Sequence, residues 1–307
     1  MTPGTWLALV TALLLSGAAV RALRRRARRE AWRRFFRHRA AAWGVGVLAF
    51  FVIAAVAAPL LAPFDPNRQL DIVELKNRGP SWIYLFGTDV LSRDVWSRVV
   101  FGARVSLAVG ALAMLLAVTL GALVGAVAGY YRRWIDATLM RLVDVGLSLP
   151  RLFVLLMVIA VLGRVPLPAL VLFIGLTSWF GTSRLVRAEV LGLRERDFIA
   201  AARALGAGSG RVIFRHVLPN AAAPIIVSAA LGIANVLLLE AGLSFFGVGV
   251  PPPDPSWGNM IADGAPHLAT APWTALFPGL AIALVVMALN AVGDALRQAL
   301  DPRQEAT

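Results

Sequence analysis

Long apolar runs alternate with short polar segments along this chain of 307 residues. Six of the runs approach or exceed the roughly 20 residues that a helix needs to cross a bilayer. They are continuous rather than apolar at every second residue, which excludes the alternating pattern of an outer-membrane barrel. The pattern predicts an all-α polytopic membrane protein with six core transmembrane helices.

A further apolar run at residues 4–20 comes before a basic segment at residues 21–39 that holds ten arginines. A secretory signal carries its positive charge before its apolar region, whereas here the charge follows. We therefore expect residues 1–39 to form an extra N-terminal membrane helix and a basic cytoplasmic segment that lies on anionic membrane lipid. An N-terminal extension without a function is the alternative for residues 1–20.

The charges give the chain a direction across the membrane. Segments assigned to the inside carry about 22 basic residues and those assigned to the outside about seven, the asymmetry typical of cytoplasmic loops. The C-terminus is then cytoplasmic. The predicted order is a first core helix at 40–62, an extracytoplasmic segment at 63–104, a five-helix core at 105–294 with a cytoplasmic loop at 194–219 and an outer loop at 247–272, and a tail at 295–307.

The net charge of +13 could suggest nucleic acid, but the arginines cluster where apolar runs end, so we expect no nucleic-acid partner. The chain has no cysteine, and its three histidines are too far apart in sequence to suggest ligands of one metal. We therefore expect no metal site.

Two features of the core predict how its helices pack. Gly121, Gly125 and Gly129 recur every four residues, a spacing that lets helix backbones approach closely in lipid. A helix over residues 137–162 is predicted to break only lightly at Pro150. Within that helix, Arg141 and Asp144 are three residues apart and could pair on one face.

The loop at 194–219 is predicted to form two short helices. Its first half has high helix propensity, Gly206 suits the left-handed position after a helix, and Ser209 could cap a second helix. Small side chains lie beside Phe198 in the first helix, and Phe214 offers a second apolar side chain in the second. Such a surface could fit a groove in another protein, or the helix pair could lie on lipid headgroups. The residue pattern alone leaves both interpretations open.

The stretch DFIAAARALGAGSGRVIFRHVLPN resembles the EAA motif of ABC-importer permeases. The matching positions are Ala201, Ala202, Gly206, Leu218 and Pro219. Ala200 stands where the family usually has Glu, which puts in doubt any salt bridge that this Glu would make. Glu195 or Asp197 could take its place.

Other stretches extend the resemblance over residues 31–303, among them FGTDVLSRDVWSRVVFGARVSLAVG, MRLVDVGLSLP and EAGLSFFGVGVPPPDPSWGNMIADG. They are similar to the C-type permease subunit of dipeptide, oligopeptide and nickel importers. The resemblance implies the type I ABC importer permease fold in the cell (inner) membrane of a bacterium or archaeon, with this chain forming half of a translocation path. It implies as partners a homologous B-type permease subunit, two ATP-binding subunits and an extracytoplasmic substrate-binding protein.

The resemblance also implies that loop 194–219 contacts the ATPase subunits. The expected coupling residues are Asp197, Phe198, Ala200, Ala201, Ala202, Gly206, Phe214, His216, Leu218 and Pro219.

This chain is not expected to be an enzyme. A P-loop needs a lysine in a glycine-rich loop, and the single lysine, Lys76, lies on the predicted outer side. We therefore expect no cofactor on this chain, with ATP and magnesium bound by the partner ATPases. An intramembrane enzyme would need catalytic groups at membrane depth, yet no histidine falls within a predicted span.

Glu240 is an acidic residue late in a predicted span. It could contact a partner subunit or line an outer gate, or it could form hydrogen bonds within this chain. Two other functions remain as alternatives to peptide import. One is a permease for nickel or another small solute, and the other is a proton-coupled secondary transporter that uses Glu240 or Asp144.

Overall fold

The computed structural model describes residues 35–36, 38–163 and 165–300. The predicted N-terminal helix, nearly all of the basic segment and residues 301–307 lie outside the described residues. Within the described ranges the chain is mainly helical. Five helices are long and apolar enough to cross a membrane, and a bent pair provides a sixth span, which confirms the predicted core.

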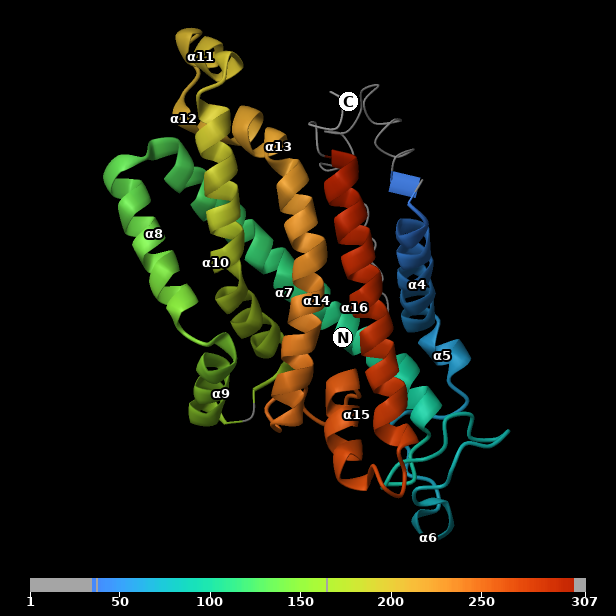
Figure 1. Cartoon of the computed structure of the whole chain (residues 1–307). Coiled ribbons are helices and arrows are strands. Elements are labelled where there is room, and N and C mark those ends of the chain that lie inside the picture. Colours follow the sequence, from blue (N-terminus) through green and yellow to red (C-terminus); the bar gives the residue numbers. More distant parts are fainter. Residues whose placement is uncertain (1–34, 37, 164, 301–307) are drawn as a thin grey trace.

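The spans form one bundle (Figure 1). They are α4 (Arg39–Val56), α7 (Val95–Tyr131), the bent pair α8 (Arg133–Ser148) and α9 (Arg151–Leu162), α10 (Leu167–Arg194), α14 (Ala222–Phe245) and α16 (Trp273–Leu300). Short helices connect them: α5 (Ala58–Leu61), α6 (Ile72–Leu75), α11 (Asp197–Ala204), α12 (Ser209–Val212), α13 (Leu218–Asn220) and α15 (Trp257–Gly264). The helices α11 and α12 lie at one end of the bundle, and α6 and α15 lie at the other.

Helix α7 is longer than the span predicted from the sequence. Its 37 residues begin directly after Asp94, whose carboxylate accepts a hydrogen bond of 2.8 Å from the backbone N–H of Ser97. This N-cap satisfies an amide that the first turn leaves free. The last residues assigned to the extracytoplasmic segment at 63–104 and the span that follows them are therefore one continuous helix.

The break at Pro150 is far stronger than predicted, because α8 and α9 meet at an angle of 81°. The ring of a proline disfavours a helical conformation in the residue before it. Leu149 accordingly adopts an extended backbone. The predicted pair of Asp144 with Arg141 does not form, since Asp144 pairs instead with Arg184 on α10.

The glycines of α7 lie at a close approach of two helices, as predicted, and the structure shows that the second helix is α10. A Cβ atom at Gly125 would lie 2.4 Å from the carbonyl oxygen of Ser183, and one at Gly129 would lie 2.9 Å from that of Arg187. At Gly121 it would lie 2.8 Å from the carbonyl oxygen of Trp179. Only the absence of side chains lets the two backbones approach this closely, so these positions fix how α7 and α10 lie together.

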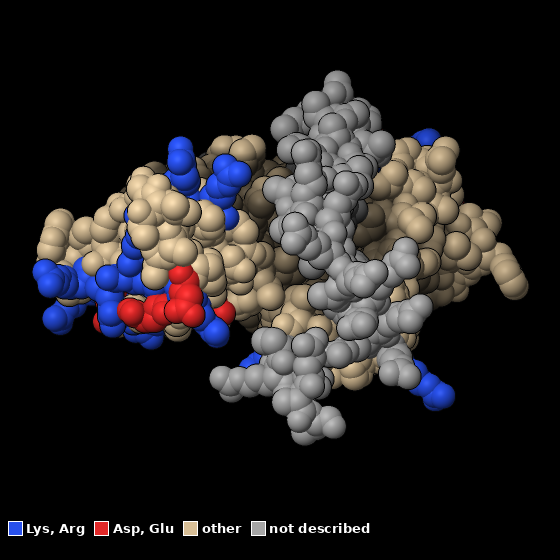
Figure 2. Space-filling model, turned by 90° about the horizontal axis from the view of Figure 1, so that it is seen from above, with Lys and Arg blue, Asp and Glu red and all other residues tan. Residues whose placement is uncertain are grey.

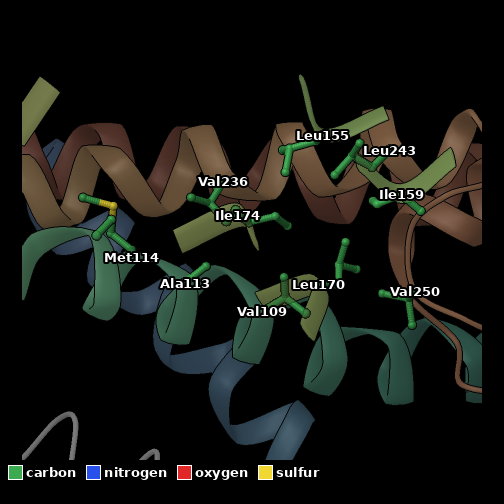
Figure 3. Packing of buried hydrophobic residues seen from close by; sticks show 11 residues of the cluster. Val109, Ala113, Met114, Leu155, Ile159, Leu170, Ile174, Val236, Leu243 and Val250 are labelled. Carbon is green, nitrogen blue, oxygen red and sulfur yellow. The ribbon is translucent and has the colours of Figure 1, made fainter. Parts of the chain in front are cut away.

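The largest group of buried apolar residues joins four spans (Figure 3). Its members come from α7, α9, α10 and α14 and from the segment after α14, and ten of them are labelled: Val109, Ala113, Met114, Leu155, Ile159, Leu170, Ile174, Val236, Leu243 and Val250. Most lie toward the end of the bundle that holds α15. This packing closes the bundle at that end.

The segment at 63–94 and the loop at 247–272 form a cap over that end. The loop contains the helix α15, and Trp257 at its start is fully buried. Asp263 on α15 lies 3.2 Å from Arg93 and 3.6 Å from Arg98, while Asp89 lies 2.6 Å from Arg93. Two acids thus hold two arginines, and the outer loop is folded onto α7 rather than free.

The close approach of α7 and α10 predicts the effect of adding one methyl group. We expect Gly125→Ala to lower the free energy of unfolding by about 1–3 kcal/mol, because the new Cβ overlaps backbone atoms that cannot move aside. The measurement is the thermal unfolding of the detergent-solubilised protein. Gly46→Ala in α4 is the matched control, since nothing lies within 4 Å of a Cβ at Gly46. Equal stability of the two variants would contradict the prediction.

Candidate coupling loop and membrane cavity

The loop between α10 and α14 forms two short helices joined at Gly206. That residue has a φ of +80°, as predicted, and follows the C-cap Leu205. The N–H of Gly206 bonds to the carbonyl oxygen of Arg203, and that of Ala207 bonds to the carbonyl oxygen of Ala202. This double closure is the Schellman motif, in which a glycine supplies the left-handed residue.

The second helix starts differently from the prediction. Its N-cap is Gly208, and the side chain of Ser209 makes no capping hydrogen bond, because Ser209 is already the first helical residue. After α12 the chain continues through a π-helical turn at Ile213–Val217, which contains Phe214 and His216. It then enters α13, which contains Leu218 and Pro219 and precedes α14.

One face of this loop is buried against the bundle. Ile199 of α11 and Val212 of α12 are fully buried, and they pack with Tyr130 of α7 and with Val186 and Val190 of α10. Ala202 also belongs to this face, with an exposed fraction of only 9%. The loop is therefore anchored on the ends of α7 and α10. Ile199 was not among the predicted residues, although an isoleucine within an alanine-rich helix already indicates an anchoring face.

The opposite face carries exposed apolar side chains. Phe198 is 41% exposed, Phe214 is 62% exposed and Leu205 is 89% exposed. Ala200 and Ala201 are exposed as well, so the three consecutive alanines divide between the two faces. Leu205 is the most exposed apolar side chain of the loop.

Polar contacts reinforce the anchor at Tyr130. Arg194 donates a hydrogen bond of 2.6 Å to the Tyr130 carbonyl oxygen, and the Arg203 guanidinium lies 4.9 Å from the centre of the Tyr130 ring. Glu195 forms an exposed ion pair of 3.1 Å with Arg132, so within this chain it already has a partner. Asp197 lies three residues before Ala200, on the same face of α11.

The remaining predicted residues lie where the loop rejoins the bundle. His216 is half-buried, and its carbonyl oxygen accepts a hydrogen bond from the Asn220 side chain. Leu218 is half-buried beside the anchoring cluster, whereas Pro219 is exposed. Seen from the end that holds α11, basic side chains gather on one side of the molecule with a group of acidic ones beside them (Figure 2). The coupling role of all these residues stays a prediction.

Glu240 on α14 lies inside the protein, where it is 1% exposed. Three serines donate to its carboxylate: Ser244 at 2.7 Å, Ser256 at 2.9 Å and Ser106 at 3.4 Å. Ser106 in turn accepts the backbone N–H of Trp257. Glu240 therefore forms hydrogen bonds within this chain, which was the alternative to a partner contact or an outer gate. Through these bonds it joins α7, α14 and α15.

A cavity of about 750 Å³ opens between the spans. Its lining includes Met114 of α7, Arg151 of α9, Ser178 and Glu189 of α10, and many residues of α14. At the end of the bundle that holds α11 it reaches Asn220, Arg297 and Leu300. None of the lining residues comes from α15 or from the segment at 63–94. The cavity therefore extends from the middle of the bundle toward the coupling loop, and it shares Met114 and Val236 with the buried core of Figure 3.

Comparison with known proteins places this architecture in a family. Residues 117–306 match the model of the binding-protein-dependent transport system inner membrane component. Residues 27–80 match the model of the N-terminal transmembrane domain of oligopeptide transport permease C. The first match covers the core from the second half of α7 onward, including the loop between α10 and α14, and the second match covers α4.

Individual relatives match over most of their length. A protein named as a peptide permease in Brucella suis biovar 1 is 44% identical over 274 residues, which cover 89% of this chain and 90% of the relative. A dipeptide transport system permease protein of Alkalihalophilus pseudofirmus is 42% identical over 283 residues, which cover 90% of each chain. With these matches, and with the helical core described above, the chain belongs to the inner-membrane permease components of binding-protein-dependent ABC transport systems.

Proposed function

We propose that this chain is the C-type permease subunit of an ATP-driven importer of dipeptides or oligopeptides, and that its loop at 194–219 receives the movement of the ATPase subunits. The observation that carries the proposal is the two-sided loop. Its inner face is anchored on α7 and α10, while Phe198, Leu205 and Phe214 are exposed on its outer face.

The anchor explains how such a loop would transmit force. Protein interiors are close-packed and deform little, so a push on α11 is passed to the ends of α7 and α10 through Ile199, Val186 and Val190. The helix α10 also lines the cavity. Movement of the loop would therefore change the shape of the cavity, as a transporter that alternates between two states requires.

In this proposal, the cavity is the half of the translocation path that this subunit contributes. It reaches the bundle end that holds the loop, and the buried core closes it toward α15. We assign the α11 end to the cytoplasm because the arginines of the loop and of the start of α8 lie there. The C-terminus is then cytoplasmic, and the cap formed by 63–94 and α15 faces the extracytoplasmic binding protein.

The proposed assembly contains this chain, a homologous B-type permease subunit, two ATP-binding subunits and the binding protein. ATP and magnesium are assigned to the ATP-binding subunits, so that this chain binds no cofactor and performs no hydrolysis. The similar proteins named above are described as peptide and dipeptide permeases, which favours peptide cargo over nickel.

Proton-coupled transport by this chain alone is the competing function. Its two candidate proton sites are both engaged in the structure, because Glu240 accepts from three serines and Asp144 pairs with Arg184. Neither acid lines the cavity. The arrangement therefore supports the ATP-driven mechanism.

Leu205 allows a direct test of the docking face. We expect Leu205→Asp to fold and insert normally, because the side chain is 89% exposed, but to lose the copurifying ATP-binding subunits and to reduce uptake at least tenfold. Copurification through a tag on this chain measures the loss. Val73→Asp is the matched control, since Val73 is 92% exposed on α6 at the other end of the bundle. Retention of the ATPases by Leu205→Asp would refute the assignment of this face.

The absence of cysteine makes the orientation testable with single substitutions. In intact cells, a membrane-impermeant thiol reagent should label Val73→Cys. It should label Leu205→Cys only after the membrane is opened, because the two residues lie at opposite ends of the bundle. Mass shift of the tagged chain on a gel measures the labelling. The reverse pattern would show that the proposed orientation is inverted.

A further inference from the structure

An arginine lies in the wall of the membrane cavity. Arg151 is the first residue of α9, directly after the 81° bend that follows α8. Its guanidinium donates a hydrogen bond of 3.1 Å to the hydroxyl of Ser178 on α10. Ser178 lies about 17 Å from the start of α10 and about 24 Å from its end, at a rise of 1.5 Å per residue. Arg151 therefore reaches the cavity near the middle of the membrane.

The positive charge of Arg151 is not balanced by an acid in the part of the chain that the structure describes. Among the described residues, no carboxylate lies within 4.0 Å of its guanidinium, whereas Arg93, Arg98, Arg132, Arg184 and Arg187 all have acidic partners. Glu189 is the acid that lines the same cavity, but it lies about 17 Å farther along α10 than Ser178. It is therefore too far away to pair with Arg151.

Ser178 positions the guanidinium without neutralising it. Its hydroxyl donates to the carbonyl oxygen of Ile174, so it offers Arg151 only an acceptor. A guanidinium has five N–H donors in a fixed plane, and this bond uses one of them. An unpaired charge at membrane depth is costly to keep, and residues of this kind commonly mark a substrate pathway.

We propose that Arg151 binds the C-terminal carboxylate of a peptide in the cavity. This inference rests on the proposed function, because it takes the cavity as the path of a peptide. The planar fork of an arginine matches the two oxygens of a carboxylate. The cavity volume of about 750 Å³ lies within the range of small-molecule sites. Asn235, Thr182 and Ser228 line the same cavity with groups that can bond to peptide amides.

The terminal carboxylate is also the group best suited to recognition by such a path. Peptides of different sequence share their backbone and two charged ends but not their side chains. Arg151, with the neutral polar side chains of Asn235, Thr182 and Ser228 in the same lining, can therefore hold many peptides without reading their sequence. A carboxylate on the partner permease is the competing occupant, and the experiment separates the two.

The test measures inhibition from the cytoplasmic side, which bypasses selection by the binding protein. The complete complex is reconstituted in vesicles with ATP inside, and labelled trialanine is supplied outside with the binding protein. Unlabelled trialanine or trialanine amide is then enclosed in the vesicles at increasing concentrations. For the wild-type complex, we expect trialanine to inhibit uptake at concentrations about tenfold lower than its amide, which lacks the terminal charge.

The variants assign this preference to one side chain. We expect both peptides to inhibit the Arg151→Gln complex at the same concentration. The Arg151→Lys complex should keep part of the preference for the free acid. Arg104→Gln is the matched control, because Arg104 lies on α7 and is not part of the cavity lining, so it should keep the full preference. Uptake without enclosed peptide shows that each variant assembles.

The outcomes are distinguishable. The role of Arg151 is overturned if Arg151→Gln keeps an unchanged preference for the free acid. It is also overturned if the wild-type complex is inhibited equally by both peptides or by neither. In both cases, ATP-dependent uptake still supports the proposed function. If Arg151→Gln lowers uptake but keeps the preference for the free acid, Arg151 instead pairs with an acid of the partner permease. Absence of ATP-dependent uptake by the wild-type complex overturns the peptide-import proposal, and this inference with it.

Discussion

The contact between α7 and α10 is the interaction on which the rest of the structure depends. Lipid is as apolar as a leucine side chain, so helices in a membrane gain little from burying apolar surface and must instead pack closely. Gly121, Gly125 and Gly129 allow this because no side chain separates the two backbones. The same two helices then supply Tyr130, Val186 and Val190, on which the coupling loop is anchored. A shift between them would move the loop and reshape the cavity together.

Buried polar groups show where the protein is fixed and where it is open to a ligand. Glu240 is held by three serines and joins α7 to α14 and α15, and Asp263 holds Arg93 and Arg98 in the cap. A buried carboxylate whose hydrogen bonds are satisfied, as that of Glu240 is, stabilises one arrangement of the helices. Arg151 differs because its partner is a neutral hydroxyl in a cavity wall. The contrast separates groups that hold the cap and bundle from a group that faces the proposed path.

The division of the coupling loop into two faces explains its proposed behaviour. The buried face contains Ile199 and Ala202, and the exposed face contains Phe198 and Leu205. A loop that was apolar only on its inner side would have nothing to offer an ATPase, and one without the anchor could not transmit movement. Because Ala200 is small and exposed, the proposed contact with an ATPase would depend here on shape and on the neighbouring apolar side chains, with Asp197 as an acid on the same face.

The sequence by itself determined the number of spans, the glycine contact and the left-handed residue at Gly206, because these follow from local features: run length, residue size and backbone freedom. It also located the loop between α10 and α14. Only the tertiary structure decided the 81° bend and the pairing of Asp144 with Arg184. The same holds for the exposure of Ala201 against the burial of Ala202, and for the place of Arg151 in the cavity. These depend on which distant segments meet. The spacing of residues along one helix says which side chains share a face, but not what that face will contact.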